Sequence, residues 1–430
     1  MVQSLNANAP DRRAYLKQLF VRAVSRCAPQ AVLPDLLPSD APKGKNLVFG
    51  AGKAAAEMAA VANAHLKGPT EGLVVTRYGH TTPHSTGQIE VLEASHPVPD
   101  EQSVEGAERM QKMASAASPD DRVIFLFSGG GSALLCAPID GVSIEQKRAI
   151  TQSLLHSGAP IDAINRVRKH LSAIKGGQLA SQVTAGAQLF TFLISDVVGD
   201  EPSDIASGPS VPLAGDPESA ISTLEQYIGL PEPAVADALR RATRRPAPEH
   251  PVVVAASAAT ALAALTAELE SDGWNVVVLG ENVEGDATLV GREHAEIALE
   301  YRDEGRAVAL VSGGELVVQV GNRSGRGGPN LEYLTSLMLA LDGATGIEAL
   351  ACDSDGIDGS EDNAGGYLGA DSMIRATAQG LDPRSLLQAN DTYTCFEALG
   401  DLIVTGPTRT NVNDIRIILI DPAEEMPGRV

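Results

Sequence analysis

Five carboxylates fall within ten residues late in the chain, directly after an apolar run at 347–352, with glycines interleaved among them. They are Asp353, Asp355, Asp358, Glu361 and Asp362. The apolar run predicts a buried strand, and the glycines allow the backbone to turn sharply after it. Clustered carboxylates repel one another, so such a stretch favours a bound cation or deep solvation. Its place at the end of a strand favours ligand binding, since open α/β sheets bind ligands there.

A solvated acidic loop is the alternative interpretation of this stretch. A calcium-binding EF-hand is excluded, because a loop counted from Asp353 needs glycine sixth and glutamate twelfth. The chain has Asp358 and Ala364 at those two positions. The sequence does not distinguish among Asp353, Asp355 and Asp358 as metal ligands.

Lys53 stands in a glycine-rich turn between an apolar strand, predicted from Asn46, and an alanine-rich helix. A lysine in the first turn of a helix is opposed by the helix dipole. Its presence beside Gly50 and Gly52 therefore suggests a ligand for an anion. A merely solvated lysine is the alternative.

The same turn can be compared with two nucleotide-binding motifs. A Walker A loop requires glycine at position 47 and Ser or Thr after the lysine, but the chain has Leu47 and Ala54. The dinucleotide fingerprint fits loosely as Gly50-x-Gly52-x-x-Ala55. The acidic residue expected after the next strand is missing, although Arg77 at that place could accommodate NADP. The interpretation that this turn binds a nicotinamide cofactor is therefore weakened but not excluded.

A second glycine-rich turn, Ser128-Gly129-Gly130-Gly131-Ser132, follows the apolar run 123–127. Three consecutive glycines free backbone N–H groups to converge on an anion where a helix begins, which predicts a phosphate or carboxylate site. An ordinary tight turn is the alternative. The segment Ser312-Gly313-Gly314-Glu315 ends another predicted strand and suggests two related halves.

Basic residues are concentrated in two places in this acidic chain. The segment 165–175 contains Arg166, Arg168, Lys169, His170 and Lys175. An anionic substrate would need such a local positive site, and a surface helix paired with acidic neighbours is the alternative. In the glycine-rich loop 321–330, Arg323 and Arg326 precede a helix N-terminus, a geometry suited to a phosphoryl group.

Two further residues stand near predicted strand ends. Asp196 follows the buried strand predicted over 188–194 and is the best placed carboxylate of its segment. His96 lies in a loop fixed by prolines, and a structural role for it is at least as well supported as a catalytic one.

Alternating strands and helices must position these residues. Apolar strands are predicted at 46–49, 123–127, 188–194, 251–256, 274–279, 306–311, 347–352 and 415–420. Helical stretches separate most of them, which predicts an α/β fold. A chain of 430 residues should form about two domains, and a proline-rich segment at 229–250 suggests their junction.

Composition narrows the classes of partner. The net charge of −22 argues against nucleic acid and anionic membranes. The four cysteines are widely spaced, which indicates free thiols in a reducing cytoplasm. Residues 1–10 lack an apolar signal core, and no run approaches the roughly 18 apolar residues of a membrane span. We expect a cytoplasmic enzyme with a small-molecule substrate, and a homodimer is one assembly state that the sequence leaves open.

Longer motifs resemble those of the glycerate 2-kinases of the bacterial and animal type, whose C-terminal part is called the MOFRL domain. The resemblance covers nearly the whole chain. The matching motifs begin at Gly50, Ser128, Val167, Leu193, Ser207, Ser312, Asp355 and Thr405.

This resemblance implies two Rossmann-like three-layer α/β domains with the site in the cleft between them. The N-terminal domain would span 1–240, and the C-terminal domain would span 241–430 with the MOFRL region at about 305–420. The resemblance further implies that ATP and D-glycerate give ADP and 2-phosphoglycerate, with Mg²⁺ as cofactor. The lysine and arginine discussed as catalytic in the family match Lys53 and Arg326.

On this interpretation, Lys53 and Arg326 neutralise the transferring phosphoryl group, while Asp196 and Asp355 hold Mg²⁺ or orient the substrate hydroxyl. The turn Ser128–Ser132 would cradle a phosphate or the glycerate carboxylate, with help from Arg168 or Lys169. The other predicted nucleotide- or substrate-binding residues are Gly50, Gly52, Ser312, Gly313, Gly314, Glu315 and Asn330.

Two positions depart from the family pattern. Pro329-Asn330-Leu331-Glu332 stands where Arg-Asn-Gln-Glu is usual, and Asp353 stands where glycine is common. Both departures resemble a subgroup linked to tartrate breakdown, whose members are often labelled hydroxypyruvate reductase. An NAD(P)H-dependent reductase of hydroxypyruvate is therefore the main alternative, and the acidic loop argues against it. A non-catalytic sensor of small acids is the third hypothesis.

Overall fold

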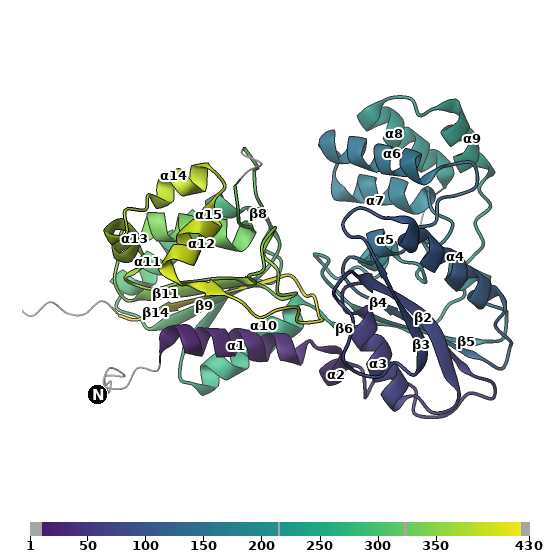
Figure 1. The fold of residues 1–430 in the computed structure, drawn as a ribbon, viewed down its shortest axis with the longest axis horizontal. Helices are drawn as coiled ribbons and strands as arrows, with labels where there is room; N and C mark the ends of the chain where they lie inside the picture. The colour runs from purple at the N-terminus through teal and green to yellow at the C-terminus, as the bar shows by residue number, and fades with distance from the viewer. Residues whose placement is uncertain (1–10, 214–215, 322–324, 423–430) are drawn as a thin grey trace, which may run out of the picture. The chain divides into compact units, whose positions relative to one another are not determined.

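A computed structural model of the chain describes residues 11–213, 216–321 and 325–422, and Figure 1 shows its ribbon. The chain divides into two compact units. Unit 1 contains Met1–Ala28 and Ala256–Val430, and unit 2 contains Pro29–Ala255. This division differs from the predicted domains 1–240 and 241–430, because the first helix belongs with the C-terminal half and the strand at 252–256 joins the N-terminal sheet.

Unit 2 is built on a six-stranded sheet in the order β3-β2-β1-β4-β5-β6. The strands are β1 (Asn46–Ala51), β2 (Thr70–Arg77), β3 (Gln88–Ala94), β4 (Arg122–Phe127), β5 (Gln188–Ile194) and β6 (Val252–Ala256). β1 pairs in parallel with β2 and β4, and the pairs β2–β3 and β4–β5 are parallel as well. The carboxyl ends of β1 to β5 therefore meet at one edge of the sheet, and the predicted α/β fold is confirmed.

Helices cover both faces of this sheet. The helices of unit 2 as a whole are α2 (Pro29–Val32), α3 (Ala55–His65), α4 (Glu101–Ser115), α5 (Gly131–Leu134), α6 (Ile144–His156), α7 (Ile161–His170), α8 (Pro217–Ile228) and α9 (Pro233–Arg241), with 3-10 turns η1 (Ala180–Gln182) and η2 (Ile205–Ser207). Leu47, Phe49 and Ala51 share one core with Ala107 and Met110 of α4. The intervening β1 positions face the other way, because strand side chains alternate, and α3 packs there.

Helices α6 to α9 form an apolar cluster of their own at one end of unit 2 (Figure 1). Leu154, Val167, Leu224 and Leu239 contribute one buried side chain from each of the four helices. Ser143 begins α6, because its side chain accepts a hydrogen bond from the N–H of Gln146, whose own side chain accepts from Ser143 N–H. This cluster holds α6 and α7 beside the carboxyl-end loops of the sheet.

Unit 1 contains a second six-stranded sheet, in the order β13-β12-β11-β14-β9-β7, and a small β10-β8 pair. Its strands are β7 (Asn275–Gly280), β8 (Gly285–Asp286), β9 (Val308–Gly314), β10 (Leu316–Val317), β11 (Ile347–Asp353), β12 (Gly365–Leu368), β13 (Leu402–Ile403) and β14 (Asp414–Ile420). β7 and β9 are parallel, but β14 runs antiparallel to both β9 and β11. As a result, Asp414 at the start of β14 lies between Gly314 and Asp353, which end the two flanking strands.

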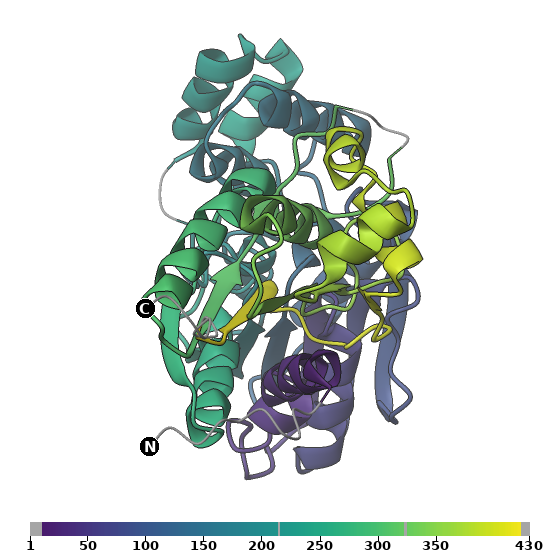
Figure 2. The same cartoon turned by 90° about the vertical axis from the view of Figure 1, so that its left-hand side faces the viewer.

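Two layers of helices enclose the sheet of unit 1. The helices are α1 (Arg12–Arg26), α10 (Ala258–Ser271), α11 (Ala287–Asp303), α12 (Pro329–Leu341), α13 (Ser372–Ala378), α14 (Pro383–Gln388) and α15 (Thr392–Leu399). Figures 1 and 2 show α1 and α10 against one face and α11 and α12 against the other.

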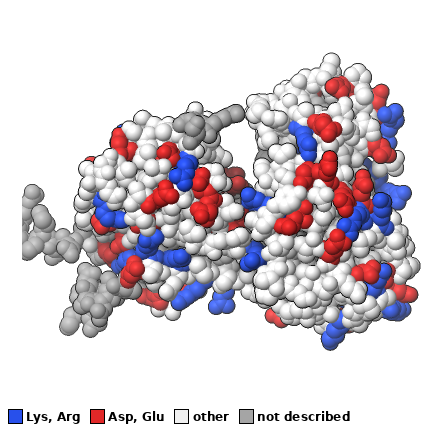
Figure 3. Space-filling view, in the orientation of Figure 1, with Lys and Arg blue, Asp and Glu red and all other residues white. Residues whose placement is uncertain are grey.

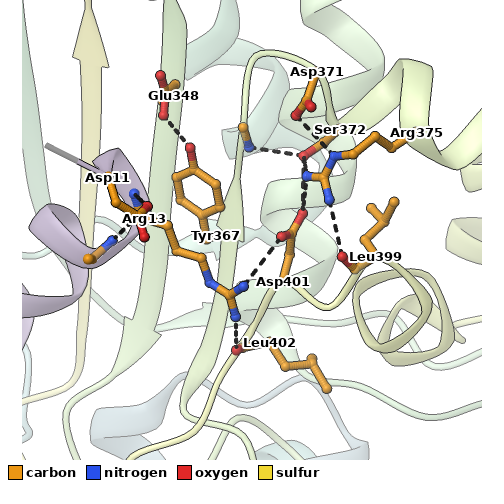
Figure 4. A network of polar contacts seen from close by, with 12 residues as sticks. Asp11, Arg13, Glu348, Tyr367, Asp371, Ser372, Arg375, Leu399, Asp401 and Leu402 are labelled. Carbon is orange, nitrogen blue, oxygen red and sulfur yellow. Dashed lines mark hydrogen bonds and ion pairs between the residues drawn. The ribbon is translucent and has the colours of Figure 1, made fainter. Parts of the chain in front are cut away.

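Polar contacts attach α1 to the C-terminal half of the chain, and this explains why α1 belongs to unit 1 and not to the predicted N-terminal domain. Arg12 forms an ion pair with Asp421 at 3.0 Å and lies over the Trp274 ring, 5.1 Å from its centre. Figure 4 shows that Arg13 donates to the carbonyl of Leu402 at 3.0 Å, next to Asp401. Asp401 is in turn paired with Arg375 at 2.5 Å.

Candidate functional site

In unit 2, the turn after β1 presents Lys53 at the carboxyl edge of the sheet. Gly52 has a φ of +138°, and a Cβ there would lie 2.1 Å from Ser128 Oγ, so only glycine fits. Gly50 is required for a different reason, because a Cβ there would lie 2.4 Å from the carbonyl oxygen of Leu126 in β4. The half-buried Lys53 follows directly and precedes α3.

The glycine-rich turn after β4 is bonded to the Lys53 turn. The N–H of Lys53 donates to the carbonyl of Gly129 at 2.9 Å, and the N–H of Ala54 donates to Ser128 Oγ at 3.0 Å. Gly130 adopts φ +79° and begins α5, and the imidazole of His96 and the stem of Lys53 lie against it. Within the described part of the chain, the N–H groups of Gly129 and Gly130 donate no backbone hydrogen bond. Two amides and a lysine thus gather at the end of β1 and β4.

Ser132 connects this turn to the loop that follows β5. Its hydroxyl lies 2.7 Å from the hydroxyl of Ser207. Ala206 and Ser207 have φ of 53° and 60°, left-handed values that cost non-glycine residues free energy and often mark functional loops. A Cβ on Gly131 would lie 2.7 Å from the Ala206 Cβ, so the third glycine admits this loop. Asp196 is half-buried at the start of the same loop, directly after Ser195.

The basic segment of α7 does not behave as one patch. Lys169 is buried and forms an ion pair with Asp204 at 2.7 Å, so its charge is already neutralised in this conformation. Arg168 is half-buried, and burial lowers its pKa. His170 is buried as well, and burial lowers its pKa to about 4. Of the two basic residues predicted to bind substrate, Lys169 thus has a carboxylate counter-ion, whereas Arg168 has none in the ion pairs of the described residues.

In unit 1, the acidic stretch after β11 folds into a compact loop in which the carboxylates have different tasks. Asp353 Oδ1 accepts from the N–H of Asp355 at 2.8 Å, and Asp355 Oδ1 accepts from the N–H of Ile357 at 2.8 Å. Asp358 accepts from the N–H groups of Asn330 and Leu331 at 3.0 and 3.1 Å, so it caps the start of α12. Burial raises the pKa of Asp358 to about 7. The structure thus uses Asp358 to hold a helix rather than to face solvent.

Arg326 lies against this acidic loop. Its guanidinium pairs with Glu361 at 3.3 Å and Glu397 at 3.4 Å, and it stacks over the Tyr393 ring, 4.2 Å from its centre. The two loops touch through glycines: a Cβ on Gly328 would lie 2.4 Å from Asp358 Oδ1. The structure therefore brings together the predicted Arg326 and Asp355 loops. Arg323 lies outside the described residues.

The predicted segment Ser312-Gly313-Gly314 is the buried end of β9 itself, and only Glu315 is exposed. The guanidinium of Arg416, which is 1% exposed, donates to the carbonyls of Gly313 and Gly314 at 3.4 and 3.2 Å. It also pairs with Asp414 at 2.6 Å.

A buried polar network surrounds Asn330, and the sequence motifs do not indicate it. Asn330 is 1% exposed, and its amide donates to Asp414 at 2.6 Å and to Asp358 at 3.3 Å. Asp414 is paired on its other side with Arg416. The only sequence signal for it is that Asp414 and Arg416 interrupt an otherwise apolar strand.

The site can be summarised unit by unit. Unit 2 assembles Gly50, Gly52, Lys53, Asp196 and the turn Ser128–Ser132 around the carboxyl ends of its parallel strands, and Arg168 lies on the neighbouring helix α7. Unit 1 assembles Arg326, Asn330, Asp355 and Ser312–Glu315 around the ends of β9 and β11. Backbone donors, cations and carboxylates of this kind can hold and polarise a phosphoryl group.

Metal binding can be tested against the donor set. Across residues 11–213, 216–321 and 325–422, no group of three or more His, Cys, Asp or Glu side chains is arranged to hold a metal ion by itself. Mg²⁺ usually binds through one or two carboxylates together with substrate phosphates and water. Asp196, which is half-buried after β5 in unit 2, and Asp355, which is 2% exposed after β11 in unit 1, are each a single carboxylate of the kind that such an ion can bind.

The surface carries charges of both signs. Figure 3 shows basic side chains standing singly or in small groups among acidic ones on the drawn face. Within the described ranges, no helix is long and apolar enough to cross a membrane.

Two family models match the chain. The first is described as "Domain of unknown function (DUF4147)" and matches residues 15–240, and the second is described as "MOFRL family" and matches 308–414. The matched part of the first model includes most of α1, from residue 15 onward, although α1 packs with unit 1.

Individual relatives are similar over nearly their full length. A putative hydroxypyruvate reductase of Agrobacterium vitis is 47% identical over 422 residues, with 96% of this chain and 95% of that protein covered. A D-glycerate 2-kinase of Thermotoga maritima is 37% identical, with 94% and 98% covered. The crystal structure of a glycerate kinase from Thermotoga maritima superimposes with a TM-score of 0.84 at 34% identity, covering 95% of this chain and 100% of that one.

Proposed function

The chain belongs to the glycerate 2-kinase family with DUF4147 and MOFRL domains, and we propose on this premise that it transfers the γ-phosphoryl group of ATP to the 2-hydroxyl of D-glycerate. The products are 2-phosphoglycerate and ADP. The observation that carries the proposal is the pair of glycine-rich turns in unit 2, where Lys53 and Ala54 donate their N–H groups to Gly129 and Ser128. Such a junction fixes a lysine and open amides at the end of a parallel sheet, where anionic ligands bind.

The residues of the chain would act mainly by position and charge, because phosphoryl transfer requires little covalent help from the protein. Lys53 neutralises negative charge that develops on the transferring group. The amides of Gly129 and Gly130 hold an anionic oxygen next to it. Arg326 supplies a second cation, and it must exchange Glu361 and Glu397 for the phosphoryl oxygens when it does so.

Mg²⁺ would neutralise the phosphate oxygens of ATP when it is bound. Asp355 and Asp196 are the residues proposed to hold it. Asp358 is a weaker candidate, since its carboxylate is occupied by the N-terminus of α12.

An NAD(P)H-dependent hydroxypyruvate reductase is the second candidate, because relatives in Agrobacterium vitis carry the name putative hydroxypyruvate reductase. The structure argues against a dinucleotide at the first turn. In the fingerprint, the second glycine leaves room for the pyrophosphate. Here Ser128 occupies the space over Gly52, 2.1 Å from where a Cβ would be.

Two parallel assays separate these activities. In the first, the purified protein receives D-glycerate, ATP and Mg²⁺, and enolase without a phosphoglycerate mutase reports 2-phosphoglycerate. In the second, NADH or NADPH oxidation is followed with hydroxypyruvate. We expect turnover in the first assay only, and turnover confined to the second would replace the kinase by the reductase.

A further inference from the structure

Two buried cations and one half-buried cation of unit 2 form no ion pair with a carboxylate among the residues that the structure describes. Lys147 in the first turn of α6 and Lys175 after α7 are 7% and 1% exposed. Arg168 of α7 is half-buried between them in the chain. No hydrogen-bond partner within the described residues is available to Lys147 Nζ, and Lys175 Nζ donates to a neutral group, the carbonyl of Ala206, at 3.1 Å. Their neighbour Lys169, by contrast, has Asp204 as a counter-ion.

The backbone places these cations around one spot. The segment after α5 pairs antiparallel with the segment after α7, because the Ala173 N–H donates to the Ala137 carbonyl at 2.9 Å. This pairing sets Cys136 beside Lys175. Helices α6 and α7 pack against each other and carry Lys147 and Arg168.

The three positive charges are close enough to repel one another. Burial lowers the pKa of Lys147, and the charge of Arg168 lowers it further. Burial also lowers the pKa of Lys175, to which both Lys147 and Arg168 contribute. Unpaired buried charges of one sign are costly, and that cost is removed either when a lysine loses its proton or when an anion binds beside the charges.

The cluster adjoins the candidate active site. The N–H of Gly176, next to Lys175, donates to the carbonyl of Ser207 at 3.1 Å. Ser207 in turn contacts Ser132 of the glycine-rich turn through their hydroxyls. A small ligand whose one end is held at Ser132 could therefore extend its other end to the cations.

We propose that Lys147, Arg168 and Lys175 form the receptor for the carboxylate of the substrate, and this rests on the kinase function proposed above. A carboxylate fits these three side chains, because none of them has a carboxylate partner in the ion pairs of the described residues. A Mg²⁺-bound nucleotide phosphate would instead need carboxylates beside it. Of the three residues, Lys147 is the one that lies outside the motifs described in the sequence. It selects hydroxy acids over neutral polyols.

The test is Lys147→Met, which keeps the aliphatic stem and removes the charge. We expect the KM for D-glycerate to rise about 10- to 100-fold, the range for loss of a charged hydrogen bond. The KM for ATP should stay within about twofold of wild type. Lys147→Arg should restore part of the affinity, and Lys112→Met, at an exposed lysine of α4, is the matched control.

Two further readouts separate this role from a structural one. The ligand-free Lys147→Met protein should have an unchanged or higher Tm, because an unpaired buried charge is gone, whereas D-glycerate should no longer raise its Tm. The preference for D-glycerate over its neutral amide should shrink in the variant. A rise in the KM for ATP alone, an unchanged KM for D-glycerate, or a lower ligand-free Tm would overturn the proposal. If wild type shows no kinase turnover, loss of the D-glycerate-induced Tm rise in the variant still supports the carboxylate receptor while the kinase function fails.

Discussion

Lys53 is held at the carboxyl edge of the unit 2 sheet by its own backbone, because its N–H donates to Gly129. Replacing the side chain leaves that hydrogen bond in place. We therefore predict that Lys53→Ala lowers kcat by about 10²- to 10³-fold, the usual cost of losing one group that stabilises charge in the transition state. Steady-state kinetics measures the loss, and circular dichroism verifies the fold. Lys67→Ala, at an exposed lysine beyond α3, serves as control, and normal turnover by Lys53→Ala would remove Lys53 from the site.

His294 provides a pH-dependent test of the interior of unit 1. It is buried against Tyr333, with Nδ1 2.8 Å from the hydroxyl, and burial lowers its pKa to about 4. The unfolded chain binds its proton near pH 6.5, so between these pH values the unfolded state holds more protons. Stability is therefore fully present above about pH 6.5 and falls as the pH drops towards 4.

The free energy of unfolding of the wild type should be higher at pH 7 than at pH 5, and we predict that His294→Gln reduces this difference by on the order of 2 kcal/mol. Urea unfolding at the two pH values measures it. The exposed His156→Gln should retain the wild-type difference, since His156 faces solvent. Equal pH slopes in wild type and His294→Gln would mean that the imidazole is not held neutral.

At the scale of elements, the β1–α3 and β4–α5 turns depend on each other's small size. A Cβ on Gly52 would meet Ser128 Oγ at 2.1 Å and its carbonyl oxygen at 2.6 Å. We predict that Gly52→Ala forces the two turns apart and lowers both stability and kcat. Gly79→Ala is the control, because Gly79 has φ +77° but open space around it.

The free energy of unfolding of the control variant should fall by only about 1–2 kcal/mol, which is the cost of placing an alanine in the left-handed conformation. Gly52→Ala should lose more stability than the control, together with most of its activity, because the steric overlap with Ser128 adds to the backbone strain. Urea unfolding curves give the loss of stability in each variant, and steady-state kinetics gives the loss of kcat. Losses of the same size in both would show that the contact with Ser128 is not decisive.

On the scale of the whole molecule, unit 1 is assembled from both ends of the sequence. Phe20 of α1 is fully buried, and the chain's one tryptophan, Trp274, lies beneath Arg12. We predict that Phe20→Ala destabilises unit 1 by about 3–5 kcal/mol, the cost of deleting a buried aromatic ring. Tryptophan fluorescence during urea unfolding reports on unit 1 directly.

The matched control is Val21→Ala on the outer side of the same helix, where the side chain is 45% exposed. This variant should unfold like wild type. If Phe20→Ala also leaves the fluorescence midpoint unchanged, α1 does not contribute to the core of unit 1.

Much of this architecture was accessible from local sequence patterns. The predicted strands at 188–194 and 347–352 appear as β5 and β11, within one residue of their bounds, because buried strands read as short apolar runs between turn residues. The turns at Gly52 and Gly130 were also predicted, since positive φ and close approach select glycine locally. The resemblance to glycerate 2-kinases, which the relatives confirm, rests on the same local motifs.

Tertiary structure alone decided which distant residues meet. Periodicity does not record the direction of a strand, so the antiparallel insertion of β14, which brings Asp414 to Asn330 and Asp353, was not foreseen. The same holds for α1, whose amphipathic pattern specifies a buried face but not the sheet that covers it. The pairing of Ser132 with Ser207, and of Lys169 but not Lys147 with a counter-ion, depends on packing between segments far apart in the chain. Local chemistry determines the turns and strands, whereas long-range burial determines which charges remain for a ligand.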